Sequence, residues 1–300
     1  MRIKKHSPIP FHLLFRYFLY LWKTSGDLLQ SRWDKFIALF GTNEYTMIVW
    51  GTFTYTTLLY WIGASCYTFI DVTGRPRWAV KHRIQETPSY PVPFTLVRKV
   101  AKQVLINQII SIPFYMIGYY LMVFRGFDNA KILPSFKRVL SELIFCVLME
   151  EVGFYYSHRV LHLPFFYKRF HKLHHEWKSP IAIAAAYCHP VEHILSNLLP
   201  TFLGPFLLGS HIFIAWIWYS CLVFFTLNNH SGFHFPFFPP SERHNFHHLR
   251  TDHSFGALGI LDHLHGTDAE FKKGETYRRN CWSFRLVPLK QLYPPEPKKH

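Results

Sequence analysis

Long apolar segments without charge alternate with polar segments along the chain. Residues 46–70 contain no charged side chain, and residues 104–124 form a second apolar stretch that includes Pro113 and Gly118. A helix of about 20 residues spans a hydrocarbon core of about 30 Å, and a proline is tolerated inside a membrane bundle. The two segments, joined by a loop that contains Pro and Arg, therefore predict a first transmembrane hairpin.

A third apolar run covers residues 194–227 and is interrupted near its middle by prolines and glycines. Its length predicts two short helices that form a second hairpin. Residues 140–156 are also apolar, but they include Glu142, Glu150 and Glu151, and carboxylates are costly in contact with lipid. We expect this segment to form an amphipathic helix that lies at the membrane interface or packs within the protein.

The composition agrees with a membrane protein that has substantial water-facing parts. Hydrophobic residues make up 49% of the chain, and charged residues make up only 17%, below the usual value of about 25%. The formal net charge is +15, but Lys and Arg occur in scattered clusters rather than in one stripe with interleaved aromatics. We therefore expect no nucleic-acid partner, and anionic lipid headgroups explain the clusters more simply.

The cysteines and the termini bear on the location of the soluble part. The chain has five cysteines, an odd number, and no two of them form a CxxC pair. A reducing compartment is therefore expected rather than a disulfide scaffold.

No short apolar core with a small-residue cleavage site follows residues 1–10, which argues against a cleaved signal peptide. The loop after residue 70 is about as basic as the N-terminus, so the positive-inside rule does not fix the orientation. The cysteines and the basic C-terminal tail favour a cytosolic site.

Ten histidines fall into four groups with regular spacing, which read HX3H, HX2HH, HX3H and HX2HH. On a helix, positions i, i+3 and i+4 share one face, so each group can aim its imidazoles at one point. A structural zinc ion takes about four ligands, so ten imidazoles suit two ions with open positions. The groups are His158 and His162; His171, His174 and His175; His230 and His234; and His244, His247 and His248.

The histidine groups stand on both sides of the predicted second hairpin, so they can meet only if both lie on the same membrane face. The sequence therefore predicts an all-α integral membrane protein with about four transmembrane helices in two hairpins and a cytosolic helical domain that carries the histidines. Imidazole binds zinc, copper, iron and nickel. Because zinc has no redox chemistry, iron is favoured for oxidation of a lipid at the membrane face.

Several other polar residues lie near the histidine groups in sequence. Glu150, Glu151, Glu192 and Asn229 are candidates for hydrogen bonds to the outer nitrogens of the ligand imidazoles, and the alternative for the acids is a solvated helix end. His189 and His193 also have HX3H spacing. For this last pair, a role beside the metals or the substrate and simple packing at the interface both stay open.

The histidine-containing segments resemble the fatty acid hydroxylase and sterol desaturase superfamily of membrane di-iron oxidases. The resemblance is carried by "EEVGFYYSHRVLH", "HKLHHEWKSPIAIAAAYCHPVEH", "HSGFHFPFFPPSERHNFHHL" and "HGTD". Within the superfamily, the segments look most like sterol C-4 methyl oxidases and the fatty acid hydroxylase domain-containing protein 2 group. The resemblance covers about residues 46–270. We expect a basic segment over residues 1–45, a first membrane hairpin over 46–124, a fatty acid hydroxylase catalytic domain with the second hairpin over 125–270 and a basic tail over 271–300.

The resemblance also implies a function. It implies two iron ions bound by the ten histidines, electrons from cytochrome b5 and its NAD(P)H reductase, and residence in the endoplasmic reticulum membrane. The implied reaction is oxidation of a C-4 methyl group of a 4-methylsterol. His234 departs from the pattern, because C-4 methyl oxidases often have an acidic residue there, which leaves the shell of the second metal and the substrate open.

Two alternatives remain from the sequence. A fatty acyl or sphingolipid hydroxylase, or a sterol C-5 desaturase, would keep the metals and change the substrate. A non-catalytic metal-binding membrane scaffold would keep only the ligands, although a scaffold needs fewer of them.

Overall fold

The protein is built from helices around a long membrane bundle. The computed structural model describes residues 11–39, 43–87, 90–128 and 131–294, and these residues contain no β-strand. Parts of the expected N-terminal segment (1–10 and 40–42) and of the expected tail (295–300) lie outside the described residues. The long helices are α1 (Phe11–Ala38), α2 (Thr52–Thr73), α4 (Phe94–Arg125), α5 (Phe136–Leu161), α8 (Leu199–Leu208) and α9 (Ile212–Asn229).

Short helices and turns connect the long ones. Three are π-helical: η1 (Thr46–Gly51), η2 (Tyr167–His171) and η5 (His193–Leu198). Three are 3₁₀-helical: η3 (His174–Glu176), η4 (Ala182–Ala186) and η6 (Glu275–Arg279). The remaining α-helical pieces are α3 (Arg77–Val80), α6 (Pro164–Phe166), α7 (Pro190–Glu192), α10 (Glu242–Arg250), α11 (Ile260–His265), α12 (Ala269–Lys273) and α13 (Leu289–Leu292).

The expected all-helical membrane fold is confirmed. Among the described residues, three helices are long and apolar enough to cross a membrane: Phe94–Arg125, Pro190–Leu208 and Ile212–His230. The second of these joins α7, η5 and α8 without a break, and is called the 190–208 helix below. It forms a hairpin with α9 through Gly209, whose φ of 59° is left-handed and is easily adopted by glycine. The predicted segment 46–70 lies in η1 and α2, which pack against α4 and α9.

The segment expected to be amphipathic, residues 140–156, lies within α5 and packs inside the protein along the 190–208 helix. Ser135 caps α5 by accepting a hydrogen bond from the backbone N–H of Arg138. All three glutamates of the segment are buried on the inner face. Packing against protein therefore explains how an apolar helix keeps three carboxylates.

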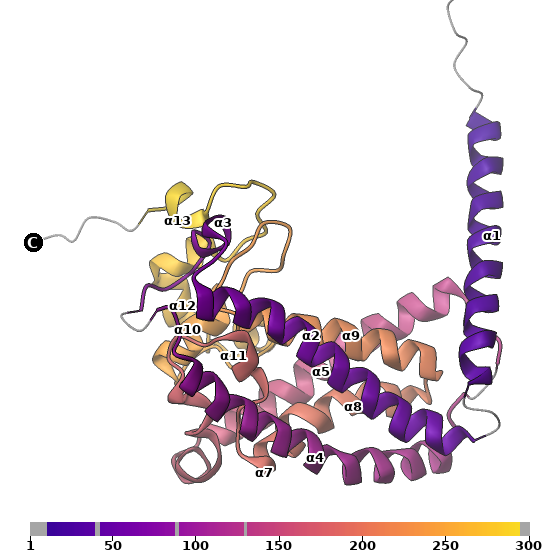
Figure 1. The fold of residues 1–300 in the computed structure, drawn as a ribbon, viewed down its shortest axis with the longest axis horizontal. Coiled ribbons are helices and arrows are strands. Elements are labelled where there is room, and N and C mark those ends of the chain that lie inside the picture. The colour runs from indigo at the N-terminus through magenta and orange to yellow at the C-terminus, as the bar shows by residue number, and fades with distance from the viewer. Residues whose placement is uncertain (1–10, 40–42, 88–89, 129–130, 295–300) are drawn as a thin grey trace, which may run out of the picture.

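The loop between α2 and α4 lies beside the histidine-rich part of the chain. Arg83 forms a buried ion pair with Asp71 (3.1 Å) and stacks on the ring of Tyr90, 3.9 Å from its centroid. The backbone N–H of His234 donates to the carbonyl of His82 (2.9 Å). Figure 1 shows α3 and α10–α13 at one end of the bundle and α1 at the other. The fold thus has a histidine-containing end and a far end.

Candidate metal centre

Five elements bring the histidines to the same end of the bundle. The last turn of α5 carries His158, and His162 directly follows the helix. The turns η2 and η3 supply His171, His174 and His175. The C-terminus of α9 supplies His230, and α10 supplies His244, His247 and His248. The i, i+3 and i+4 spacing works as predicted on α10, where all three rings share one face.

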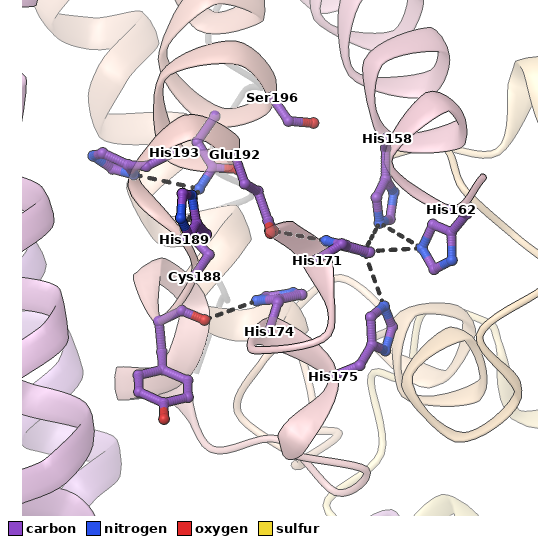
Figure 2. A network of polar contacts seen from close by, with 12 residues as sticks. His158, His162, His171, His174, His175, Cys188, His189, Glu192, His193 and Ser196 are labelled. Carbon is purple, nitrogen blue, oxygen red and sulfur yellow. Dashed lines mark hydrogen bonds and ion pairs between the residues drawn. The ribbon is translucent and has the colours of Figure 1, made fainter. Parts of the chain in front are cut away.

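Five of these histidines form what we call the five-histidine cluster: His158, His162, His171, His175 and His247. Their ligand atoms all lie within 4.8 Å of one another. The Nε2 atom of His171 lies 3.1 Å from that of His158, 2.9 Å from that of His162 and 3.0 Å from that of His175. Figure 2 shows these four rings converging on one point.

Four further histidines form what we call the four-histidine cluster: His174, His230, His244 and His248. The Nε2 atom of His230 lies 3.2 Å from that of His174 and 2.8 Å from that of His244. His174 and His175 are consecutive residues in different clusters, and so are His247 and His248. The two clusters are therefore neighbours, with the rings of His175 and His248 only 4.8 Å apart.

Backbone carbonyls fix the tautomers of four of these imidazoles. In the five-histidine cluster, Nδ1–H of His158 donates to the carbonyl of Phe255 (2.7 Å), and Nδ1–H of His247 donates to that of His253 (2.8 Å). In the four-histidine cluster, Nδ1–H of His230 donates to the carbonyl of Thr226 (2.8 Å), and Nδ1–H of His174 donates to that of Tyr187 (3.3 Å). A neutral imidazole has only one N–H, so each Nε2 carries a lone pair. Nitrogen lone pairs that converge in a buried space are the donors that a metal cation needs, so this residue set fits two metal ions.

Burial keeps the imidazoles neutral. Desolvation lowers the pKa of His174 to about 4 and that of His247 to about 3. For His162 and His175, desolvation and the neighbouring rings lower the pKa further. Because the neutral ring is the metal-binding form, protons do not compete for these nitrogens near neutral pH.

Two buried carboxylates hold the clusters in place. Oε1 of Glu192 lies 2.9 Å from Nδ1 of His171 (Figure 2), so this candidate contacts a cluster imidazole directly. Glu151 instead accepts hydrogen bonds from the backbone N–H groups of Leu258 (2.7 Å) and Leu261 (3.1 Å). It therefore fixes the loop whose Phe255 carbonyl orients His158. Carboxylates that position metal ligands in this way strengthen metal binding.

Glu150 and Asn229 contact no cluster nitrogen. Both line a cavity of about 340 Å³ that also touches His230 and His244. Glu150 and Asn229 are both buried, so their polar groups face the interior of the protein rather than bulk water. The cavity also carries apolar side chains from α5 and α9, namely Phe154, Leu222 and Phe225.

The structure does not bring His234 into either cluster. Gly232 has a φ of 71°, so the chain leaves the helix after α9 and the HX3H spacing loses its helical meaning. The Nδ1 atom of His234 lies 3.5 Å from Oε1 of Glu242, and neither ring nitrogen forms a hydrogen bond within the described residues. Nine of the ten expected ligands therefore converge, and His234 lies apart from them.

The two histidines that lead into the second hairpin also lie outside the clusters. Nδ1 of His189 accepts a hydrogen bond from the backbone N–H of Val191 (3.1 Å) and so caps the 190–208 helix. Nε2 of His193 lies 3.0 Å from the hydroxyl of Ser111 on α4. Figure 2 shows both rings on the other side of Glu192 from the five-histidine cluster.

Sequence reasoning missed the carbonyl acceptors of Phe255, His253, Tyr187 and Thr226. A backbone carbonyl has no side-chain signal, so only the fold reveals these contacts. Asp262 organises the same loop as Phe255, by accepting from the backbone N–H groups of Phe255 (2.7 Å) and Gly256 (2.8 Å).

Comparison with known proteins places this site in a family. The family model described as fatty acid hydroxylase matches residues 143–267, a range that holds every histidine of both clusters. Fatty acid hydroxylase domain-containing protein 2 of Homo sapiens is 38% identical over 279 residues, which cover 93% of this chain and 84% of that protein. The chain belongs to the fatty acid hydroxylase family.

More distant relatives of the family differ in the activities that their names give. Methylsterol monooxygenase 2-1 of Arabidopsis thaliana is 26% identical, with 82% of this chain and 97% of that protein covered. Very-long-chain aldehyde decarbonylase GL1-8 of Oryza sativa subsp. japonica is 29% identical, with 82% and 93% covered. No solved structure matches the chain. The family is known for binding iron, and membership makes this chain a membrane oxidase with histidine clusters suited to metal.

Proposed function

We propose that this protein is a di-iron monooxygenase that oxidises a membrane lipid, with the C-4 methyl group of a 4-methylsterol as its target. The observation that carries the proposal is the pair of adjacent buried clusters, in which nine imidazoles each bring one ring nitrogen within 4.8 Å of the others of its cluster. A structural zinc site needs only about four ligands, so two clusters exceed what a scaffold requires.

The five-histidine cluster would hold one iron ion and the four-histidine cluster the other. Bound iron would supply the dioxygen activation that oxidation of an unactivated C–H bond requires. Other residues of the chain orient the ligands and shield them from water. The carbonyls of Phe255 and His253 accept hydrogen bonds from His158 and His247, and Glu192 contacts His171. His234 is not a ligand in this proposal, because it lies outside both clusters.

The cavity beside His230 and His244 is the proposed place of the substrate. Phe154, Leu222 and Phe225 give it an apolar wall that suits a lipid, and Glu150 and Asn229 on the same two helices add polar groups for orientation. Similarity to a methylsterol monooxygenase over most of both chains supports a sterol as the lipid. Fatty acyl hydroxylation and sterol desaturation are competing assignments that the same centre allows.

The proposed reaction balances as R–CH3 + O2 + 2 e⁻ + 2 H⁺ giving R–CH2OH + H2O. One oxygen atom enters the new C–O bond, and the other leaves as water. Cytochrome b5 and its NAD(P)H reductase are the proposed source of both electrons, and further rounds would carry the alcohol to a carboxylate. The proposed location is the endoplasmic reticulum membrane, with the centre on the cytosolic face.

The test uses detergent-purified, iron-loaded protein supplied with NAD(P)H, cytochrome b5 and its reductase. Separate reactions receive a 4-methylsterol, a 4-desmethyl sterol and a long-chain acyl lipid, and products are measured by mass spectrometry. We expect a 4-hydroxymethyl sterol from the first reaction, and none with His174→Ala. A hydroxylated acyl lipid alone would replace the sterol assignment with the acyl one. No product from any substrate, with both irons bound, would refute the monooxygenase proposal.

A further inference from the structure

The contacts between the long helices fix the direction of each one in the bundle. Trp216, near the start of α9, donates to the hydroxyl of Thr52 at the start of α2 (2.9 Å). Near the other ends of these helices, the hydroxyl of Tyr67 donates to Oδ1 of Asn228 (3.4 Å). The helices α2 and α9 are therefore parallel, and both run toward the histidine-containing end.

The helix α4 runs in the same direction as the 190–208 helix, away from the histidines. Near its middle, Nδ2 of Asn107 donates to the carbonyl of Cys188, which lies just before the 190–208 helix (2.9 Å). At its end, the guanidinium of Arg125 donates to the carbonyl of Leu207 (2.9 Å). The chain therefore leaves α4 at the far end of the bundle, although the first histidine group follows only about one helix later.

The helix α5 brings the chain back over the whole length of the bundle. Just before it, the backbone N–H of Asp128 donates to the carbonyl of Gly209 in the turn of the second hairpin (3.0 Å). Along it, Ser157 lies 2.9 Å from Ser196, hydroxyl to hydroxyl. Cys146 packs so tightly on Gly204 that a Cβ there would lie 2.8 Å from it. The earlier residue of α5 contacts the later residue of the 190–208 helix, and the later residue contacts the earlier one. The two helices are therefore antiparallel, and they lie side by side at the same level of the bundle.

Glycines at this contact are typical of helices that pack inside a bilayer. A Cβ on Gly153 would lie 3.2 Å from the Cα of Pro200, so both Gly153 and Gly204 let the two backbones approach closely. Small residues drive such packing in membranes, where apolar side chains gain little by leaving lipid.

Exposed apolar side chains follow one another along α5 over a membrane-spanning distance, and the exposed Lys137 lies at one end of this distance. Side chains at every fourth position are 40–60% exposed. The first and last of them are 20 residues apart, which is about 30 Å along a helix and equals the hydrocarbon core. Together they form what we call the outer stripe of α5: Phe136, Leu140, Ile144, Leu148, Val152 and Tyr156.

Polar groups on α5 are arranged as lipid contact requires. Within residues 140–155, all of which the structure describes, the one exposed polar side chain is Ser141, and its hydroxyl donates to the carbonyl of Arg138 one turn earlier (3.0 Å). The inner face carries Glu142, Glu150 and Glu151, each at most 8% exposed. These inward carboxylates lower the average hydropathy of α5 without facing lipid.

We infer that α5 is a membrane-spanning helix whose outer stripe contacts the acyl chains of the bilayer, and that α1 lies on the membrane face opposite the metal centre. Five helices then cross the membrane: α2, α4, α5, the 190–208 helix and α9. Because the number of crossings is odd, the segment before α2 and the segment after α9 lie on opposite sides of the membrane.

The position of α1 agrees with this topology. The side chain of Gln30 accepts from the backbone N–H of Leu133 at the far end (2.8 Å), and Trp33 packs against Ile212 and Trp216 at the start of α9. Figure 1 shows α1 standing across the direction of the bundle rather than along it. It therefore lies along the membrane face and adds no crossing.

Protease protection in sealed microsomes tests the topology. One epitope tag is placed ahead of Met1 and a different one after His300 on the full chain, and each is followed by immunoblot with and without detergent. We expect one tag to be digested in sealed vesicles and the other only after detergent. If both tags are digested, or both protected, the number of crossings is even and the inference is overturned. Neither outcome depends on iron or on substrate.

A charge in the outer stripe tests the lipid contact itself. Leu148→Lys would place an ammonium group at the middle of the proposed span, whereas Leu286→Lys changes an equally apolar exposed residue outside the bundle (77% exposed). We expect several-fold less folded, membrane-integrated protein for Leu148→Lys than for Leu286→Lys. Equal amounts of both variants would show that Leu148 faces water, and would contradict the lipid contact.

Discussion

Replacing Glu151 with glutamine should loosen the metal centre from a distance. Glu151 is 2% exposed and accepts from the backbone N–H groups of Leu258 and Leu261. In Glu151→Gln one oxygen remains as an acceptor, but the new NH2 group faces a backbone N–H. The loop it holds carries the Phe255 carbonyl, which fixes the tautomer of His158.

The expected magnitude is set by these contacts. A hydrogen bond to a charged acceptor contributes about 1.5–3 kcal/mol, and leaving a buried donor unpaired costs about 1–3 kcal/mol. We therefore expect Glu151→Gln to lower the free energy of unfolding by about 3 kcal/mol. For a chain of this size that corresponds to an apparent Tm about 5–10 °C lower.

The assay measures melting temperature and metal per chain in detergent-purified protein. Glu142→Gln is the matched control, because it makes the same change in a buried carboxylate of α5 that pairs with Arg138 (2.6 Å) away from the centre. We expect Glu151→Gln to lose metal from the five-histidine cluster and Glu142→Gln to keep it. If both variants have the same metal content and the same Tm, the positioning role assigned to Glu151 is wrong.

Three further predictions concern the clusters. Glu192→Leu should weaken metal binding about 10- to 100-fold, as loss of a carboxylate that orients a ligand does, while Glu192→Gln should keep most of the affinity because its amide oxygen can occupy the same place beside Nδ1 of His171. Chelator competition measures both variants, and equal affinities would contradict the contact. His234→Asn should leave the metal content of the parent unchanged, and loss of one ion per chain would make His234 a ligand. Lowering the pH from 7 to about 5 should release no metal. Burial lowers the pKa of His174 to about 4 and that of His247 to about 3, so protons compete with the metal only near those values. Metal analysis after dialysis checks this, and release near pH 6.5 would contradict it.

The sequence predicts much of the fold, because apolar length and helical spacing are local properties. The second hairpin is evident from residues 194–227, and the i, i+3 and i+4 spacing identifies the ligand face of α10. The same spacing misleads at His234, because the left-handed Gly232 ends the helical geometry after His230. A Cβ at Gly232 would lie 2.9 Å from the carbonyl oxygen of Pro180, and that constraint comes from a distant part of the chain.

The path of α5 and the orientation of the imidazoles lie beyond sequence reasoning for a similar reason. The glutamates of α5 look incompatible with a span until all three are seen to be buried inside the protein, with Glu151 against the loop at Leu258 and Leu261. The carbonyls of Phe255 and Tyr187 set two tautomers, but any residue type supplies a carbonyl at those positions. Long-range packing decides both features.

Counting metal shows whether the two histidine clusters hold iron. Protein expressed with iron supplementation is purified in detergent and analysed for iron and zinc per chain, beside His247→Ala for the five-histidine cluster and His230→Ala for the four-histidine cluster. We expect about two irons per chain, as in two-metal sites, and a loss of iron in each variant. Parent protein that is folded yet free of metal, or variants that keep the full content, would contradict it.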